Sequence, residues 1–109
     1  MPNHFDLDQL FSALANPTRR EVLETLRDGP KSVSELAAPH DMALPSFMQH
    51  LRQLEDAGLV RSEKAGRVRT VEACEAPMLE LAAWLDEQRI TWEGRLNQLD
   101  DFVTKEHAR

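Results

Sequence analysis

Proline and glycine residues divide the first part of this chain into short segments, and this punctuation limits the fold more than any other feature. Asn16-Pro17, Gly29-Pro30, Pro39 and Gly58 each stand where one apolar stretch ends or the next one begins. Pro suits the first turn of a helix, and Gly suits its C-terminal cap, so these residues mark helix boundaries. The sequence therefore predicts several short helices before about residue 60.

Between these boundaries the apolar residues recur at steps of three and four, which is typical of amphipathic helices. Four short helices are expected, at about 5–15, 17–28, 33–38 and 45–57. Ser32-Val33-Ser34-Glu35 has the Ser-x-x-Glu form of a capping box, so the third helix should begin at Ser32 or Ser34. Pro45 lies where the first turn of the fourth helix is expected, and Gly58 follows its end.

The spacing of the apolar residues changes after Gly58. Residues 68–72 alternate apolar or β-branched with polar side chains, and Ala65-Gly66-Arg67 before them has the composition of a turn. A β-hairpin is therefore expected at about 59–73, followed by a long helix at about 77–103. This order predicts a mostly α fold with a β-hairpin wing. It is a winged helix-turn-helix in one domain, 1–109, with the helix-turn-helix at about 33–57.

Composition places the chain among ordinary globular proteins and excludes several classes. It has 109 residues and one cysteine, Cys74, so no disulfide can form within it. The four histidines have no cysteine at ligand spacing, and neither a metal nor another cofactor is expected. No signal peptide or membrane-spanning run is recognisable, which predicts a cytoplasmic protein without a membrane partner.

The charge is unevenly distributed. The net charge is −6, but residues 41–70 carry five bases against four acids, whereas residues 71–109 carry nine acids against four bases. A basic middle on an acidic chain is compatible with a nucleic-acid-binding face.

In a winged helix-turn-helix the second helix of the pair enters the major groove, and a basic hairpin tip contacts the phosphates or the minor groove. The candidate DNA contacts are Ser46, Phe47, Gln49, His50, Arg52 and Gln53 on the fourth helix, Lys64, Arg67 and Arg69 on the hairpin, and Arg19 and Arg20 near a helix start. Each has a plainer interpretation as well. In this interpretation the hairpin tip is only solvated, and Arg19 and Arg20 form surface ion pairs with Glu21 or Glu24. His50 would then pack against the core.

These residues resemble the ArsR-type winged helix-turn-helix repressors. The resemblance rests on Ala15-Asn16-Pro17-Thr18-Arg19-Arg20, Ser34-Glu35-Leu36-Ala37 and His50-Leu51-Arg52-Gln53-Leu54-Glu55-Asp56-Ala57-Gly58-Leu59-Val60, with a wing after them. It implies a homodimer on double-stranded DNA with a palindromic operator, and repression relieved by a signal such as a small-molecule effector. The chain lacks the thiol and histidine clusters of the metal-sensing members, so it looks closer to the metal-independent branch. Met48-Gln49 stands where related sequences often have Ser-Lys, so the operator sequence does not follow from the family.

The resemblance also implies that the first and last helices form the dimer interface. On the last helix, apolar residues recur at steps of three, four and seven, as in a seam between two helices. The expected interface residues are Leu7, Leu10 and Phe11 on the first helix, and Leu85, Trp92, Leu96, Leu99 and Val103 on the last. Trp84 and Trp92 either anchor this interface or line a small-molecule pocket.

The sequence bears on two other classes of function. An enzyme is not expected, because the sequence has no nucleophile–base pair and no Gly-rich phosphate loop. The alternative is a winged helix that binds protein and has no strong DNA binding, which the net charge of −6 favours. Steep salt dependence would distinguish DNA binding from this alternative. Neither the direction of regulation nor a redox role of Cys74 follows from the sequence.

Overall fold

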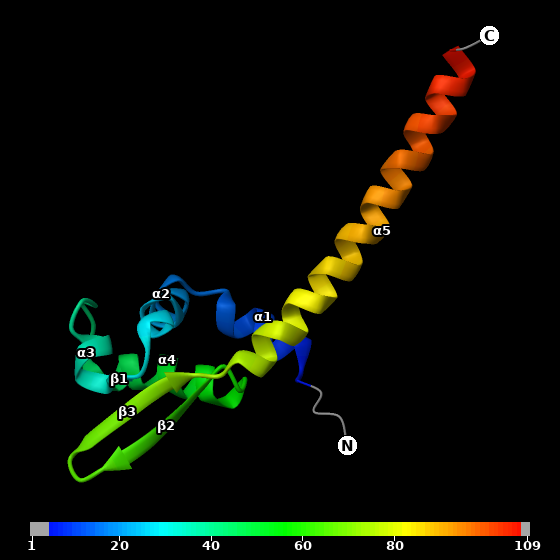
Figure 1. Cartoon of the computed structure of the whole chain (residues 1–109). Coiled ribbons are helices and arrows are strands. Elements are labelled where there is room, and N and C mark those ends of the chain that lie inside the picture. Colours follow the sequence, from blue (N-terminus) through cyan, green and yellow to red (C-terminus); the bar gives the residue numbers. More distant parts are fainter. Residues whose placement is uncertain (1–4, 108–109) are drawn as a thin grey trace. The chain divides into compact units, whose positions relative to one another are not determined.

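A computed structural model describes residues 5–107 of the chain (Figure 1). The helices are α1 (Leu7–Leu14), α2 (Pro17–Thr25), α3 (Val33–Ala37), α4 (Leu44–Asp56) and α5 (Glu75–His107), with a 3₁₀ turn, η1 (Leu26–Asp28), after α2. The strands are β1 (Lys31–Ser32), β2 (Val60–Ala65) and β3 (Val68–Ala73). The chain divides into two compact units between Leu79 and Glu80. The mostly α fold with a β-hairpin wing is confirmed.

The first three helices begin at side-chain caps. Asp6 accepts hydrogen bonds from the backbone N–H groups of Asp8 and Gln9, at 2.9 and 3.3 Å. Asn16 accepts one from the backbone N–H of Arg19, with Pro17 in the first turn. Such caps satisfy N–H groups that have no partner inside the helix.

The predicted capping box lies at the start of α3. The Ser32 hydroxyl accepts from the backbone N–H of Glu35, and the Glu35 carboxylate accepts from that of Ser32, both at 3.1 Å. Hydrogen bonding of the Glu35 carboxylate to the backbone N–H of Ser32, and then to the Ser32 side chain, lowers the pKa of this carboxyl. Of the two starts left open by the sequence, Ser32 is therefore the cap.

The wing is part of a three-stranded antiparallel sheet with the order β1-β3-β2. In the hairpin, Val60 pairs with Ala73 and Ala65 with Val68, which leaves Gly66 and Arg67 as the turn. Gly66 has a φ of 64°, a left-handed conformation that favours glycine. The sequence predicted this hairpin but not β1, a strand of two residues that is too short to show a period.

The interior is formed by apolar side chains from every helix and from the sheet. Fully or almost fully buried are Leu10, Val22, Leu36, Phe47, Leu51, Leu54, Leu59 and Val71. The structure corrects the expectation for Leu10, which was placed in the dimer interface. Its side chain is 0% exposed because α1 packs against both α2 and α4.

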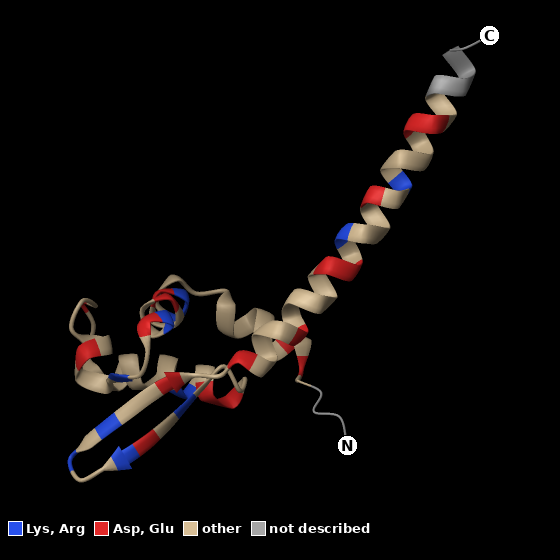
Figure 2. Ribbon diagram, in the orientation of Figure 1, with Lys and Arg blue, Asp and Glu red and all other residues tan. Residues whose placement is uncertain are grey.

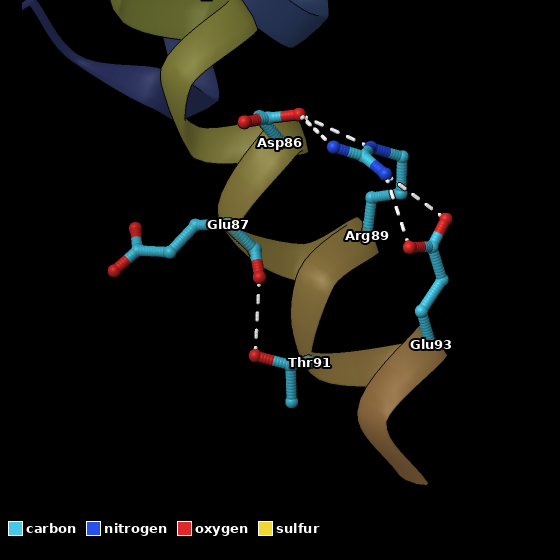
Figure 3. Close-up of polar contacts among 5 residues, drawn as sticks. All are labelled: Asp86, Glu87, Arg89, Thr91 and Glu93. Carbon is cyan, nitrogen blue, oxygen red and sulfur yellow. Dashed lines mark hydrogen bonds and ion pairs between the residues drawn. The ribbon is translucent and has the colours of Figure 1, made fainter. Parts of the chain in front are cut away.

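Helix α5 has 33 residues and begins two positions before the predicted start at 77. Charged side chains reinforce its middle (Figure 3). Arg89 donates to Asp86 at 2.7 Å and to Glu93 at 3.0 Å, and Thr91 donates to the carbonyl of Glu87. Ion pairs at i, i+3 and i, i+4 stabilise an exposed helix modestly. The interface residues predicted on this helix are all exposed, from 43% at Val103 to 61% at Trp92.

No helix in the described part of the chain is long and apolar enough to cross a membrane. Among residues 5–107, no three His, Cys, Asp or Glu side chains gather closely enough to hold a metal ion.

Candidate nucleic-acid interface

Helix α4 has one buried and one exposed face. Phe47, Leu51 and Leu54 are at most 2% exposed, and their spacing of four and three places them on the inner side. The exposed face carries Ser46, Gln49, Arg52 and Gln53. These side chains offer the hydrogen-bond donors and acceptors that base edges in a major groove require.

Phe47 was a candidate DNA contact, and the structure corrects this. Its ring is 1% exposed and lies 5.5 Å from the imidazole of His40, centroid to centroid. A ring held in the interior cannot reach a base edge without unfolding the helix. Phe47 therefore fixes α4 to the core, and the polar residues beside it form the outer face.

The hairpin carries exposed cations toward its tip. Figure 2 shows basic segments at the far end of the β2–β3 ribbon, where Lys64 lies shortly before the turn and Arg67 lies within it. Arg61, nearer the base of the hairpin, forms an ion pair with its cross-strand partner Glu72. The positive charge of the wing is therefore compensated at its base by Glu72 and is strongest at its tip.

A groove of 310 Å³ separates α4 from the wing. Its lining is Ser32, Val33, Ser34, Met48, Arg67, Val68 and Arg69. The groove thus joins the start of α3, one side of α4 and the tip of the wing into a single concave surface. Sequence reasoning named the two arginines but missed Ser32, Ser34 and Met48, because their roles depend on the position of the hairpin over α3.

Arg69 is held in place by a chain of two hydrogen bonds. Its Nη1 donates to the hydroxyl of Ser62 at 3.0 Å, and that hydroxyl donates to the carboxylate of Glu55 at 2.6 Å. Glu55 belongs to α4, and Ser62 and Arg69 belong to the two strands of the wing. The contact therefore fixes the wing against α4 and orients the guanidinium of Arg69 toward the groove that it lines.

Known proteins resemble this chain over the same elements. A helix-turn-helix domain family matches residues 14–63. The HTH-type transcriptional regulator Rv2034 of Mycobacterium tuberculosis is 37% identical over 79 residues, 72% of this chain and 74% of that protein. A crystal structure of an ArsR family transcriptional regulator is 55% identical, with a TM-score of 0.77 over 80% of this chain and 90% of the other.

The chain belongs to the ArsR family of transcriptional regulators. A further relative, the transcriptional repressor SdpR of Bacillus subtilis, is 28% identical over 61 residues, which are 56% of this chain and 68% of SdpR. Across three curated relatives that it matches, this chain covers between 61% and 74% of their length. As an ArsR family member it is a DNA-binding transcription regulator, as the sequence predicted. Its assignment to the metal-independent branch stays a prediction.

In this ArsR family chain, Arg19 and Arg20 have different surroundings although they are adjacent. Arg19 is 8% exposed and donates to the carbonyls of Ala13 and Ser12, at 2.7 and 3.1 Å. Arg20 is exposed and donates to the carbonyl of Leu14 at 2.8 Å. The expectation of a DNA contact at Arg19 is corrected, because its guanidinium binds the end of α1.

His50 is half-buried on α4 beside Arg19. Nη1 of Arg19 lies 2.8 Å from its Nδ1 atom. Burial lowers the pKa of His50, and the charges of Arg19 and His40 lower it further. These effects favour the neutral form of His50, whose side chain contacts Arg19 and remains partly exposed.

Proposed function

We propose that this regulator is a repressor that binds a palindromic operator as a homodimer, with α4 in the major groove and the wing on the neighbouring phosphates. The observation that carries the proposal is the groove between α4 and the wing, with Arg67 and Arg69 on one wall and Met48 on the other. Gln49, Arg52 and Gln53 stand exposed on α4 for contact with base edges, and Lys64 adds charge at the tip of the wing.

Arg20 and Ser46 complete the proposed contact set as exposed polar side chains near helix starts. His50 is retained in it as a neutral side chain at the edge of the face. Phe47 and Arg19 are left out because both are buried.

The homodimer is supported by the exposed apolar row on α5. Leu85, Trp92, Leu96, Leu99 and Val103 are each more than 40% exposed although they repeat at helical spacing. Such a row costs free energy in water unless another surface covers it. A second copy of α5 offers the matching row that could cover it.

Repression is supported by the printed name of SdpR, a transcriptional repressor. We infer that the protein acts in the cytoplasm, on the DNA of its own cell, and that it acts by binding and not by catalysis.

The test is binding of the purified protein to DNA from immediately upstream of its own gene, titrated with salt and footprinted. We expect protection of a palindrome and an affinity that falls steeply as salt rises. Arg67→Ala should weaken binding to all sequences and reduce the salt slope by about 1. Gln49→Ala should cost about 1–3 kcal/mol at the operator and less on unrelated DNA.

Arg27→Ala is the matched control for Arg67→Ala. It removes the same charge from η1, an element that does not line the groove, and should leave the operator affinity unchanged. If the folded protein does not bind its upstream DNA at low salt, the proposal is overturned in favour of a winged helix that binds protein.

A further inference from the structure

A second cavity lies on the other elements of the first unit. It has a volume of 690 Å³, within the range of about 300–1,000 Å³ that is usual for small-molecule sites. It is lined by the end of α1, by helix α2 with η1, by Leu59, by the end of β3 and by the first turn of α5. It shares no lining residue with the groove beside α4, and it is not built from Trp84 and Trp92.

The surface of this cavity is apolar at its base. Leu26 and Leu59 are 4% and 0% exposed and form the floor, while Leu14 and Leu23 are half-buried on the walls. The half-buried side chains of Leu14 and Leu23 remain in contact with water until a ligand covers them. The base of the cavity therefore favours an apolar molecule.

The charged residues at the cavity cancel one another. Arg20 and Arg27 contribute two positive charges, and Glu24 and Glu75 contribute two negative charges. Both arginines are already engaged, since Arg20 donates to the carbonyl of Leu14 at 2.8 Å and Arg27 to that of Glu24 at 3.4 Å. A ligand with a net charge gains little from this balance, whereas an uncharged one finds hydrogen-bonding groups at the edge.

The cavity adjoins the joint that holds the wing to α4. Leu59 follows the end of α4, Cys74 follows the end of β3, and the backbone N–H of Cys74 donates to the carbonyl of Leu59 at 2.9 Å. Both residues line the cavity. A molecule in the cavity would contact both residues, which connect α4 and the wing, the two elements that the proposed function places on DNA.

We propose that this cavity is an effector site for an uncharged, largely apolar organic molecule, and that its occupation weakens DNA binding. The weakening rests on the proposed function, because it requires an operator. The binding itself does not, and the two are therefore tested separately.

Binding is tested without DNA, with N-phenyl-1-naphthylamine as an uncharged probe and 8-anilino-1-naphthalenesulfonate as its anionic analogue. Cys74 is the one cysteine of the chain and lines the cavity, so its alkylation by iodoacetamide reports occupation directly. At a probe concentration ten times its Kd, alkylation should slow about tenfold, because only the empty fraction reacts. The anionic analogue should bind more weakly than the uncharged probe.

Two leucine variants localise the probe. Leu23→Trp fills the cavity from its wall and should abolish both the probe fluorescence and the protection of Cys74. Leu44→Trp makes the same change at an exposed position outside the cavity and should retain both. Protection in the unmodified chain needs no variant, so the test stands even if Leu23→Trp does not fold.

Three outcomes overturn the binding site: an unchanged alkylation rate at saturating probe, probe binding that Leu23→Trp leaves intact, or a Cys74 that is unreactive in the dimer and becomes reactive on dilution. The last would mean that a second copy of the chain covers the cavity.

Coupling is then measured as operator affinity with and without N-phenyl-1-naphthylamine. We expect the Kd for DNA to rise at least about fivefold, and DNA to weaken the probe by the same factor, since coupling between sites is reciprocal. Probe binding with an unchanged operator Kd overturns the effector role. A protein that binds the probe but no DNA instead contradicts the proposed function and leaves the ligand site standing.

Discussion

Nη1 of Arg19 lies 2.8 Å from Nδ1 of His50, and this contact ties the start of α2 to the outer part of α4. Arginine only donates hydrogen bonds, so Nδ1 of His50 accepts, and the proton of the neutral ring is on Nε2. The same guanidinium binds the carbonyls of Ser12 and Ala13 at the end of α1. One buried cation thus connects the three helices α1, α2 and α4.

Removing this cation should destabilise the fold. Arg19→Met leaves two helix-end carbonyls and His50 without their donor, and we expect a loss of about 2–4 kcal/mol, since an unsatisfied buried polar group costs about 1–3 kcal/mol. The measurement is urea unfolding at fixed protein concentration, because dimer stability depends on concentration.

Arg20→Met is the matched control. Arg20 is exposed and binds one carbonyl, so its loss should cost less than about 1 kcal/mol. Equal effects of the two changes would contradict the structural role of Arg19.

The same contact makes stability depend on pH. The pKa of His50 in the folded protein is lowered below its ordinary value, mainly by burial and further by Arg19 and His40. The unfolded chain therefore binds a proton at a higher pH than the folded protein does. The contribution of His50 to the free energy of unfolding is complete above its unfolded pKa of about 6.5. It is lost as the pH falls through the lower pKa of the folded protein.

Urea midpoints between pH 8 and pH 5 measure this effect. His50→Gln keeps an acceptor for Arg19 but does not titrate. As the pH is lowered, its urea midpoint should therefore fall less than that of the unmodified protein. A difference between the two proteins that is constant across this range would contradict the lowered pKa.

Much of the fold followed from local rules in the sequence. Asn16 and Ser32 are capping residues whose role depends on neighbours within three positions, and the alternation after Gly66 identified the wing. Burial of charge is different, because it depends on the packing of distant segments. The sequence gives Arg19 and Arg20 the same chemistry, and only the packing of α1 against α2 and α4 separates them.

The candidate site was likewise predictable only in part from the sequence. Helical spacing placed Gln49 and Arg52 on the outer face of α4, and the structure exposes both. The contribution of Met48 to the groove was not predictable, because it requires the position of the hairpin relative to α3 and α4. The strand β1, which pairs Lys31 with Val71 and closes this arrangement, is likewise a tertiary feature.

The hydrogen bond between Ser62 and Arg69 predicts a coupling in DNA binding. Ser62→Ala should weaken operator binding about two- to tenfold, because an unheld side chain must be ordered on binding at a cost of about 0.5–1.5 kcal/mol. Arg69→Ala should have a larger effect. In the Arg69→Ala background, Ser62→Ala should have no further effect, whereas in the Arg67→Ala background it should keep its full effect. Additive effects in both backgrounds would show that Ser62 does not position Arg69.

The apolar row on α5 predicts where a charge prevents dimer formation. Leu96 and Ile90 are both 58% exposed on the same helix, but they point about 120° apart at 100° per residue. Leu96 lies in the row with Leu85, Trp92 and Val103, and Ile90 does not. Leu96→Glu should therefore raise the dimer dissociation constant at least about tenfold, since it would bury a charge in an apolar seam. Ile90→Glu makes the same change outside the row and should leave the mass in sedimentation equilibrium that of the unmodified protein. If both variants dissociate equally, or neither does, this row does not form the interface and the dimer must be formed by another surface.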